Sequence, residues 1–172
     1  EDAWLHTTLC QYRGMMDEMN IEKAVIMPLN DPFLMSMEFT IDAVHRNLRD
    51  MKQQYPGKFY AFADVDPRNA PTQSVDAIVY ALDRCHLDGI KIHPNNTGIA
   101  LDNKYNDPIF SLAQRRKIPV AIHSYPNQED DVSAARRIVK VKERYPDLKL
   151  IVSHMGAFQW KNLIPLECYV DM

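Results

Sequence analysis

Three histidines stand directly after short apolar runs, and their placement is the strongest chemical signal in the sequence. The runs read Gly-Ile-Lys-Ile-His-Pro at 89–94, Pro-Val-Ala-Ile-His-Ser at 119–124 and Leu-Ile-Val-Ser-His-Met-Gly at 150–156. Their histidines are His93, His123 and His154. Imidazole binds zinc and similar divalent metals, and it exchanges protons near neutral pH. Three such rings brought together could hold a metal or move protons.

Taken singly, each histidine also fits a hydrogen-bonded structural role. Neighbouring parallel strands lie about 4.8 Å apart, so side chains that leave their ends in one direction can converge on one ion or substrate. Successive side chains alternate between the two faces of a strand, which puts Lys91 on the face of His93. A lysine that points inward is costly unless it pairs with an interior acid or has a chemical role.

Six apolar runs predict strands, and amphipathic segments between them predict helices. The near-continuous apolar character of the runs is typical of a parallel sheet covered on both faces. The predicted strands are 23–29, 59–65, 89–92, 119–122, 148–152 and 166–170. The predicted helices are 38–55, 74–85, 106–117 and 131–145.

This alternation predicts a parallel α/β fold in a single domain over residues 1–172. An open doubly wound sheet and part of a (β/α)₈ barrel both satisfy the pattern, and a whole barrel usually takes about 250 residues. The sequence has only five glycines and contains neither Gly-x-Gly-x-x-Gly nor a phosphate-binding Gly-x-x-x-x-Gly-Lys-Ser/Thr loop, which favours the barrel.

Composition narrows the class of protein. A formal net charge of −3 gives no reason to expect nucleic acid, and no apolar run reaches the roughly 20 residues of a membrane span. The three cysteines lack zinc-site spacing, and free thiols fit a reducing compartment, so we expect a cytoplasmic location. Acidic neighbours make the basic residues of 136–144 a solvated helix face. Asp64 and Asp66 follow their strand and could enter the site, but Asp66-Pro67 is typical of the start of a turn, which we prefer.

The ordered set of Gly-Ile-Lys-Ile-His-Pro, Ile-Pro-Val-Ala-Ile-His and Leu-Lys-Leu-Ile-Val-Ser-His-Met-Gly resembles the amidohydrolase-related family that includes aminocarboxymuconate-semialdehyde decarboxylase. The resemblance covers nearly the whole chain and implies strands two to seven of a (β/α)₈ barrel. It also implies one divalent metal, often zinc, held by a strand-one His-x-His, a strand-five histidine and a strand-eight aspartate.

Residues of this sequence match three positions of that pattern. His123 matches the strand-five metal ligand, and His154 matches the strand-six histidine that assists proton transfer. Lys91 and His93 match strand four, where substrate binding is implied. Asn95 and Tyr125 follow in the neighbouring loops and could contribute to the site.

The sequence departs from the family at both ends. It contains no His-x-His and ends at Met172 without a strand-eight aspartate, and His6 stands alone. A catalytic zinc normally has three protein ligands. We therefore expect this sequence to be one part of a longer protein, and we expect that it does not turn over substrate by itself. A barrel cut in this way exposes two sheet edges, which further chain or another copy in a homo-oligomer would have to cover.

The resemblance implies a hydrolase that attacks an amide, ester or lactone of a small molecule with metal-activated water. A decarboxylase of the same family is the alternative. Two other readings stay open: an aldolase-like enzyme in which Lys91 forms a Schiff base, and a truncated barrel or binding module without catalysis.

Overall fold

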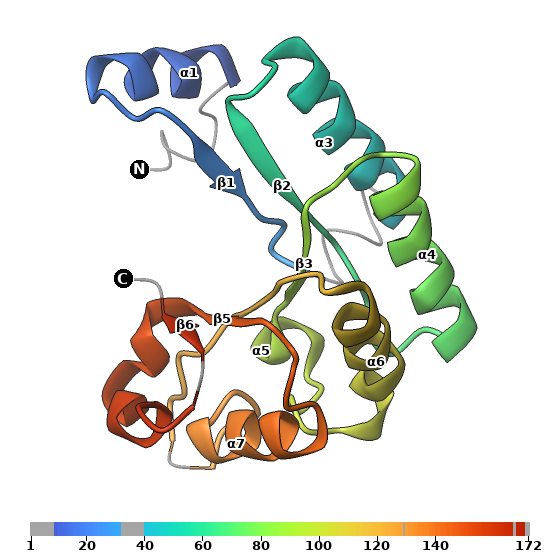
Figure 1. Ribbon diagram of the computed structural model, residues 1–172, viewed down its shortest axis with the longest axis vertical. Helices are drawn as coiled ribbons and strands as arrows, with labels where there is room; N and C mark the ends of the chain where they lie inside the picture. Colours follow the sequence, from blue (N-terminus) through green and yellow to red (C-terminus); the bar gives the residue numbers. More distant parts are fainter. Residues whose placement is uncertain (1–8, 32–39, 129, 167, 171–172) are drawn as a thin grey trace.

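The structure, a computed structural model, describes residues 9–31, 40–128, 130–166 and 168–170. Its strands form one parallel sheet in the order β1-β2-β3-β4-β5-β6. Their bounds are β1 (Ala24–Ile26), β2 (Phe59–Ala63), β3 (Gly89–Ile92), β4 (Val120–Ile122), β5 (Leu150–Val152) and β6 (Tyr169–Val170). The sheet curls, and its helices follow one another around the outside (Figure 1). This confirms the prediction of a partial (β/α)₈ barrel.

Helices connect the strands on the outer side. They are α1 (Leu9–Glu18), α3 (Ile41–Gln54), α4 (Pro71–Asp83), α5 (Pro94–Thr97), α6 (Asp107–Arg116) and α7 (Ala135–Arg144), with 3₁₀ segments η2 (Lys104–Asn106) and η3 (Ser153–Leu163). Local signals explain several boundaries. The Thr40 hydroxyl accepts a hydrogen bond from the Ala43 N–H and caps α3, and Pro71 occupies the first turn of α4, where no backbone N–H is needed.

Several predicted boundaries were wrong. The helix predicted over 131–145 begins only at Ala135, because the Asp131 carboxylate accepts the N–H groups of Asn127 and Ser133 and makes a turn instead. The helix predicted over 74–85 begins earlier, at Pro71, and the strand predicted over 166–170 is reduced to Tyr169–Val170. Positions 38 and 39 of the first predicted helix lie outside the described residues.

The main core lies between the sheet and the outer helices. Ile90 and Ile92 on β3 are at most 1% exposed and belong to the same cluster as Ile109 and Phe110 on α6 and Ile138 on α7. The two isoleucines therefore face the helices, as predicted, and the alternation along β3 turns Lys91 to the inner face.

Side chains on the inner face of the sheet are buried where β2 pairs with β3, but they are exposed to solvent near the two edge strands. Phe62 is the register partner of Gly89, and a Cβ at Gly89 would lie 2.6 Å from the Phe62 ring, so only glycine admits this ring. Val25 and its partner Tyr60 are 47% and 45% exposed, and Tyr169 is 67% exposed. Apolar side chains at the two margins thus face solvent, which agrees with a barrel of which only part is described.

Within the described part of the chain, β1 and β6 each pair with one strand only, as expected for the two edges of an incomplete barrel. None of the helices in this part is long and apolar enough to cross a membrane.

Candidate functional site

The three predicted histidines converge at the carboxyl end of the sheet. Ile92, Ile122 and Val152 are aligned across β3, β4 and β5, so His93 and His123 emerge at one level and His154 one residue further on. The rings of His93 and His123 stack with centroids 3.8 Å apart and an angle of 12°. The His154 ring meets His123 edge-on at 4.8 Å, with its Nε2 3.2 Å from the His123 Nδ1. The predicted convergence is confirmed.

The backbone is left-handed at His154, the residue whose ring contacts His123. His154, Met155 and Gly156 all have positive φ, at 58°, 52° and 65°. Left-handed conformations are unfavourable for residues with a Cβ, and such strain often accompanies functional sites. Glycine suits position 156, because its positive φ strains residues with a Cβ, and a Cβ there would also require the Leu163 side chain to move. The 3₁₀ segment that begins here was not foreseen from the sequence.

His93 is held by the loop that follows it. Its Nδ1 accepts a hydrogen bond from the Asn96 N–H at 3.3 Å and thereby caps α5. The accepting role assigns the proton of the neutral ring to Nε2, which can donate to a ligand. Burial, followed by the positive charge of Lys91, lowers the pKa of His93 to about 4. The ring is therefore neutral at pH 7.

His123 is neutral at pH 7 for similar reasons. Burial is the largest cause, and the nearby His93 and Lys91 add to it, lowering the pKa of His123 to about 4. The neutral imidazole is the form that binds a metal ion. Since Nδ1 faces His154, Nε2 is the nitrogen of His123 best suited to a metal.

Lys91 lies close to both rings. It is 6% exposed on the inner face of β3, and its charge helps to lower the pKa of His93 and of His123. An ammonium group beside two neutral imidazoles favours an anionic group on a ligand. Substrate binding by Lys91 and His93 stays a prediction, as do the metal role of His123 and the catalytic role of His154.

The donor set suits a metal only in part. His123 supplies a neutral nitrogen, and His154 lies beside it. Among the described residues, however, no group of three or more His, Cys, Asp or Glu side chains could hold an ion. That this stretch contributes one ligand and its neighbour stays a prediction. His6 and Asp171 lie outside the described residues.

Two further loop residues have distinct places. Tyr125 is 56% exposed, and its ring meets that of His154 edge-on at 6.0 Å, so it lies at the opening of the site. Asn95 instead donates from its Nδ2 to the Asp131 carboxylate at 3.1 Å, which joins the loops after β3 and β4. Neither Asp131 nor Asn96 was singled out from the sequence, because the Asn95–Asp131 hydrogen bond joins residues 36 positions apart and Asn96 meets the His93 ring only through the cap of the short helix α5.

A second polar group follows β2. The Asn30 amide donates to the Asp64 carboxylate, and the His45 Nε2 accepts from the Asp64 N–H at 3.0 Å. These residues, the buried polar cluster, are 4%, 2% and 0% exposed in the order Asn30, Asp64, His45. Burial raises the pKa of Asp64 even though the Asn30 hydrogen bond opposes the shift. The cluster stabilises the end of β2, and the predicted turn follows at Asp66, whose carbonyl accepts from the Asn69 N–H.

The arrangement matches a known family. The family model described as Amidohydrolase matches residues 35–169, more than half of the sequence. The chain belongs to the amidohydrolase family. Among curated protein sequences, none matches the chain.

Solved structures show the same fold. A TIM-barrel protein from Bordetella bronchiseptica superposes with a TM-score of 0.76 and 16% identity, over 95% of this chain and 58% of its own. The 5-carboxyvanillate decarboxylase of Novosphingobium aromaticivorans, complexed with manganese and 4-hydroxy-3-methoxy-5-nitrobenzoic acid, gives 0.72 and 24%, over 92% and 51%. The 2,6-dihydroxybenzoate decarboxylase from Rhizobium gives 0.66 and 15%, over 84% and 55%. The chain thus spans little more than half the length of these structures.

Proposed function

We propose that the complete protein is a metal-dependent hydrolase of the amidohydrolase superfamily that acts on an amide, ester or lactone of a small molecule. The observation that carries the proposal is the convergence of two stacked, neutral imidazoles and a third exposed one at the carboxyl ends of β3, β4 and β5. Catalytic groups of (β/α)₈ enzymes gather at this end of the barrel.

In this proposal each residue has a definite role. His123 would hold the metal through Nε2, with further ligands from outside the described residues. When bound, a divalent metal such as zinc supplies Lewis acidity, which polarises a carbonyl and acidifies water. Lys91 binds an anionic group of the substrate, and the Nε2–H of His93 donates a hydrogen bond to it. His154 takes up and returns the proton at its imidazole nitrogen.

Decarboxylation of a small carboxylic acid is the second candidate. Two of the similar structures are decarboxylases of aromatic acids, one of them with manganese. The same groups would serve, with Lys91 binding the carboxylate and His154 delivering a proton to carbon as carbon dioxide leaves.

Metal analysis of the full-length protein tests the shared part of both candidates. We expect about one divalent metal per chain, reduced by His123→Ala and unaffected by His86→Ala, whose exposed imidazole lies before β3 at the opposite end of the sheet. A full-length protein that neither contains nor takes up zinc or manganese would overturn the metal-dependent proposal. Borohydride trapping of a carbonyl substrate on Lys91 would then favour Schiff-base chemistry.

A paired assay separates the two reactions. The metal-loaded protein is incubated with a panel of esters, lactones and amides, and separately with aromatic and unsaturated carboxylic acids. Acid production from the first panel supports the hydrolase, whereas carbon dioxide from the second, with no turnover of the first, supports the decarboxylase instead.

A further inference from the structure

Asp131 occupies a central place between the two loops that leave the histidine strands. One carboxylate oxygen accepts from the Asn95 Nδ2 at 3.1 Å and the other from the Asn127 N–H at 2.8 Å. Asn95 comes two residues after His93, and Asn127 comes four residues after His123. A single carboxylate therefore joins the segments that follow the two stacked rings.

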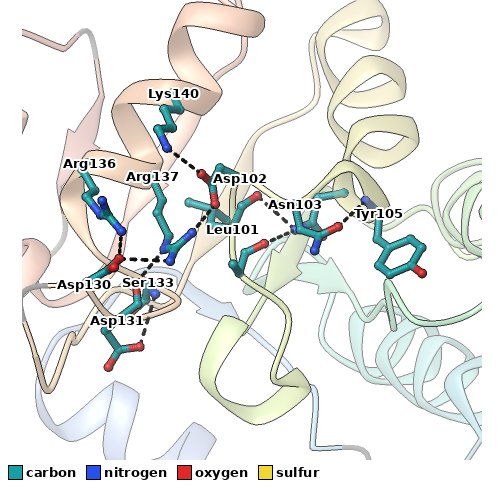
Figure 2. Close-up of polar contacts among 12 residues, drawn as sticks. Leu101, Asp102, Asn103, Tyr105, Asp130, Asp131, Ser133, Arg136, Arg137 and Lys140 are labelled. Atoms are coloured by element: carbon teal, nitrogen blue, oxygen red, sulfur yellow. Dashed lines mark hydrogen bonds and ion pairs between the residues drawn. The ribbon is translucent and has the colours of Figure 1, made fainter.

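The position of Asp131 is itself fixed from the outer side. Arg137 on α7 donates from Nε to the Asp131 carbonyl oxygen at 2.8 Å and from Nη1 to the Asp102 carboxylate at 2.6 Å. Figure 2 shows Arg137 reaching both Asp102 and Asp130 from the first turn of α7, with Asp131 beside them. Asp102 and Arg137 have side chains only 14% and 19% exposed, so this pair is less screened by solvent than a surface ion pair.

The pKa of Asp102 agrees with a structural role for its ion pair with Arg137. Burial alone would raise the pKa of Asp102, but hydrogen bonds and charge from Arg137 and Lys140 hold it below its ordinary value. A backbone hydrogen bond from the Leu101 N–H to the Val132 carbonyl at 2.9 Å adds a second link between the same loops. The segment after α5 and the start of α7 are thus bonded to each other beside Asp131 and fix its position.

We propose that Asp131 is a positioning residue that ties the loop after β3 to the loop after β4 and so holds His93 and His123 face to face. In the described part of the chain it forms no hydrogen bond with either ring and acts through Asn95 and Asn127, while its charge acts directly on His123 and partly opposes the lowering of the His123 pKa by burial. Groups that orient site residues in this way commonly change metal affinity by about 10–100-fold when removed. The relevance of this role to catalysis rests on the proposed function, whereas the geometry does not.

The chain offers a charge-swap test. Asp131→Ala removes both acceptor oxygens, and in Asn95→Asp two carboxylates face each other, so each of these single variants loses the link. The double variant Asn95→Asp/Asp131→Asn restores it, because the amide at 131 donates to the carboxylate at 95 while its oxygen accepts from Asn127. Asp130→Ala is the matched control: its carboxylate pairs with Arg136 and Arg137, and its side chain is 64% exposed.

The readout is the imidazole nitrogen NMR spectrum of His93 and His123 in metal-free full-length protein, with manganese affinity as a second measurement. We expect shifted imidazole signals and roughly tenfold or greater weakening of manganese binding in each single variant, recovery in the double variant, and no change in Asp130→Ala. Single variants with wild-type imidazole signals, or a double variant no closer to wild type than the singles, would overturn the role of Asp131. Wild-type protein that binds no metal would overturn the proposed function alone, since the imidazole spectra still decide the positioning role.

Discussion

The histidine site and the buried polar cluster occupy equivalent places at the ends of neighbouring strands. They differ in their exposure to solvent and in the contacts of their side chains. Asp64 follows β2 as His93 follows β3 and His123 follows β4. In the cluster, Asn30, Asp64 and His45 are almost wholly buried and bond to one another and to backbone. At the site, His154 is exposed and three rings meet at an opening.

The difference shows that a polar residue at a strand end is not by itself a functional signal. Buried polar groups are mostly hydrogen-bonded within the protein, and the Asp64 carboxylate accepts from Asn30 and from the Val65 N–H. Among the described residues, each side chain of the cluster also keeps one buried atom without a partner, namely Asn30 Oδ1, His45 Nδ1 and Asp64 Oδ2. The histidine rings instead contact one another, and His154 and the neighbouring Tyr125 are exposed to solvent. Accessibility separates the two groups more clearly than residue type does.

The largest expected effect tests the chemical side of this comparison. His154→Gln in the full-length protein should lower the turnover of whichever substrate the paired assay identifies by about 10²–10⁴-fold, because it removes the group that moves the proton. The unfolding free energy should change by less than about 1 kcal/mol, since the side chain is exposed. Initial rates and urea denaturation measure the two quantities, with His86→Gln as the control. Unchanged turnover would remove His154 from the mechanism.

The next effect tests the structural side. Asp64→Ala leaves the N–H groups of Asn30 and Val65 without their acceptor, and each buried donor so orphaned costs about 1–3 kcal/mol. Urea denaturation should show a loss of this order. Asp64→Asn keeps one carbonyl oxygen and removes a buried charge whose pKa is already raised, so it should cost less. Equal losses for the two variants would contradict the assignment of the cluster to hydrogen-bonded stability.

The smallest of these effects concerns pH. The pKa of His93 falls from 6.5 to about 4 on folding, so between these values the unfolded chain binds more protons than the folded one. The stability of the metal-free protein should therefore decrease as the pH is lowered from 6.5 to 4, by up to about 3 kcal/mol for this residue. Denaturation curves across this range measure the slope, which His93→Gln should reduce.

For Asp64 we expect the opposite dependence of stability on pH. Its raised pKa means that the folded state holds its proton more firmly, so its unfavourable contribution develops as the pH rises above 3.8 and is relieved by acid. Asp64→Asn should remove this component from the same denaturation curves.

A pH profile of His93→Gln that matches the wild type would show that the His93 ring is charged or exposed in the folded protein.

Much of the fold could be read from local pattern. The predicted strand 89–92 coincides with β3, and Ile90 and Ile92 pack in the core cluster with the outer helices, as the predicted alternation requires. Errors fell where a side chain competes with the helix for backbone N–H groups, as Asp131 does before α7. The left-handed turn after Ser153 was also missed, because its conformation depends on close packing of Gly156 against Leu163.

The sequence by itself determined the alternation of strands and helices and the position of each histidine at a strand end, because hydrophobic periodicity and chain order are local properties. Only the tertiary structure decided that His93 and His123 stack, that His154 turns back toward them, and that Asp131 joins their loops. Those relations connect residues about 30 positions apart, and they depend on sheet register and on burial, which lowers the pKa of two imidazoles to about 4. No pattern along the chain encodes such distances directly.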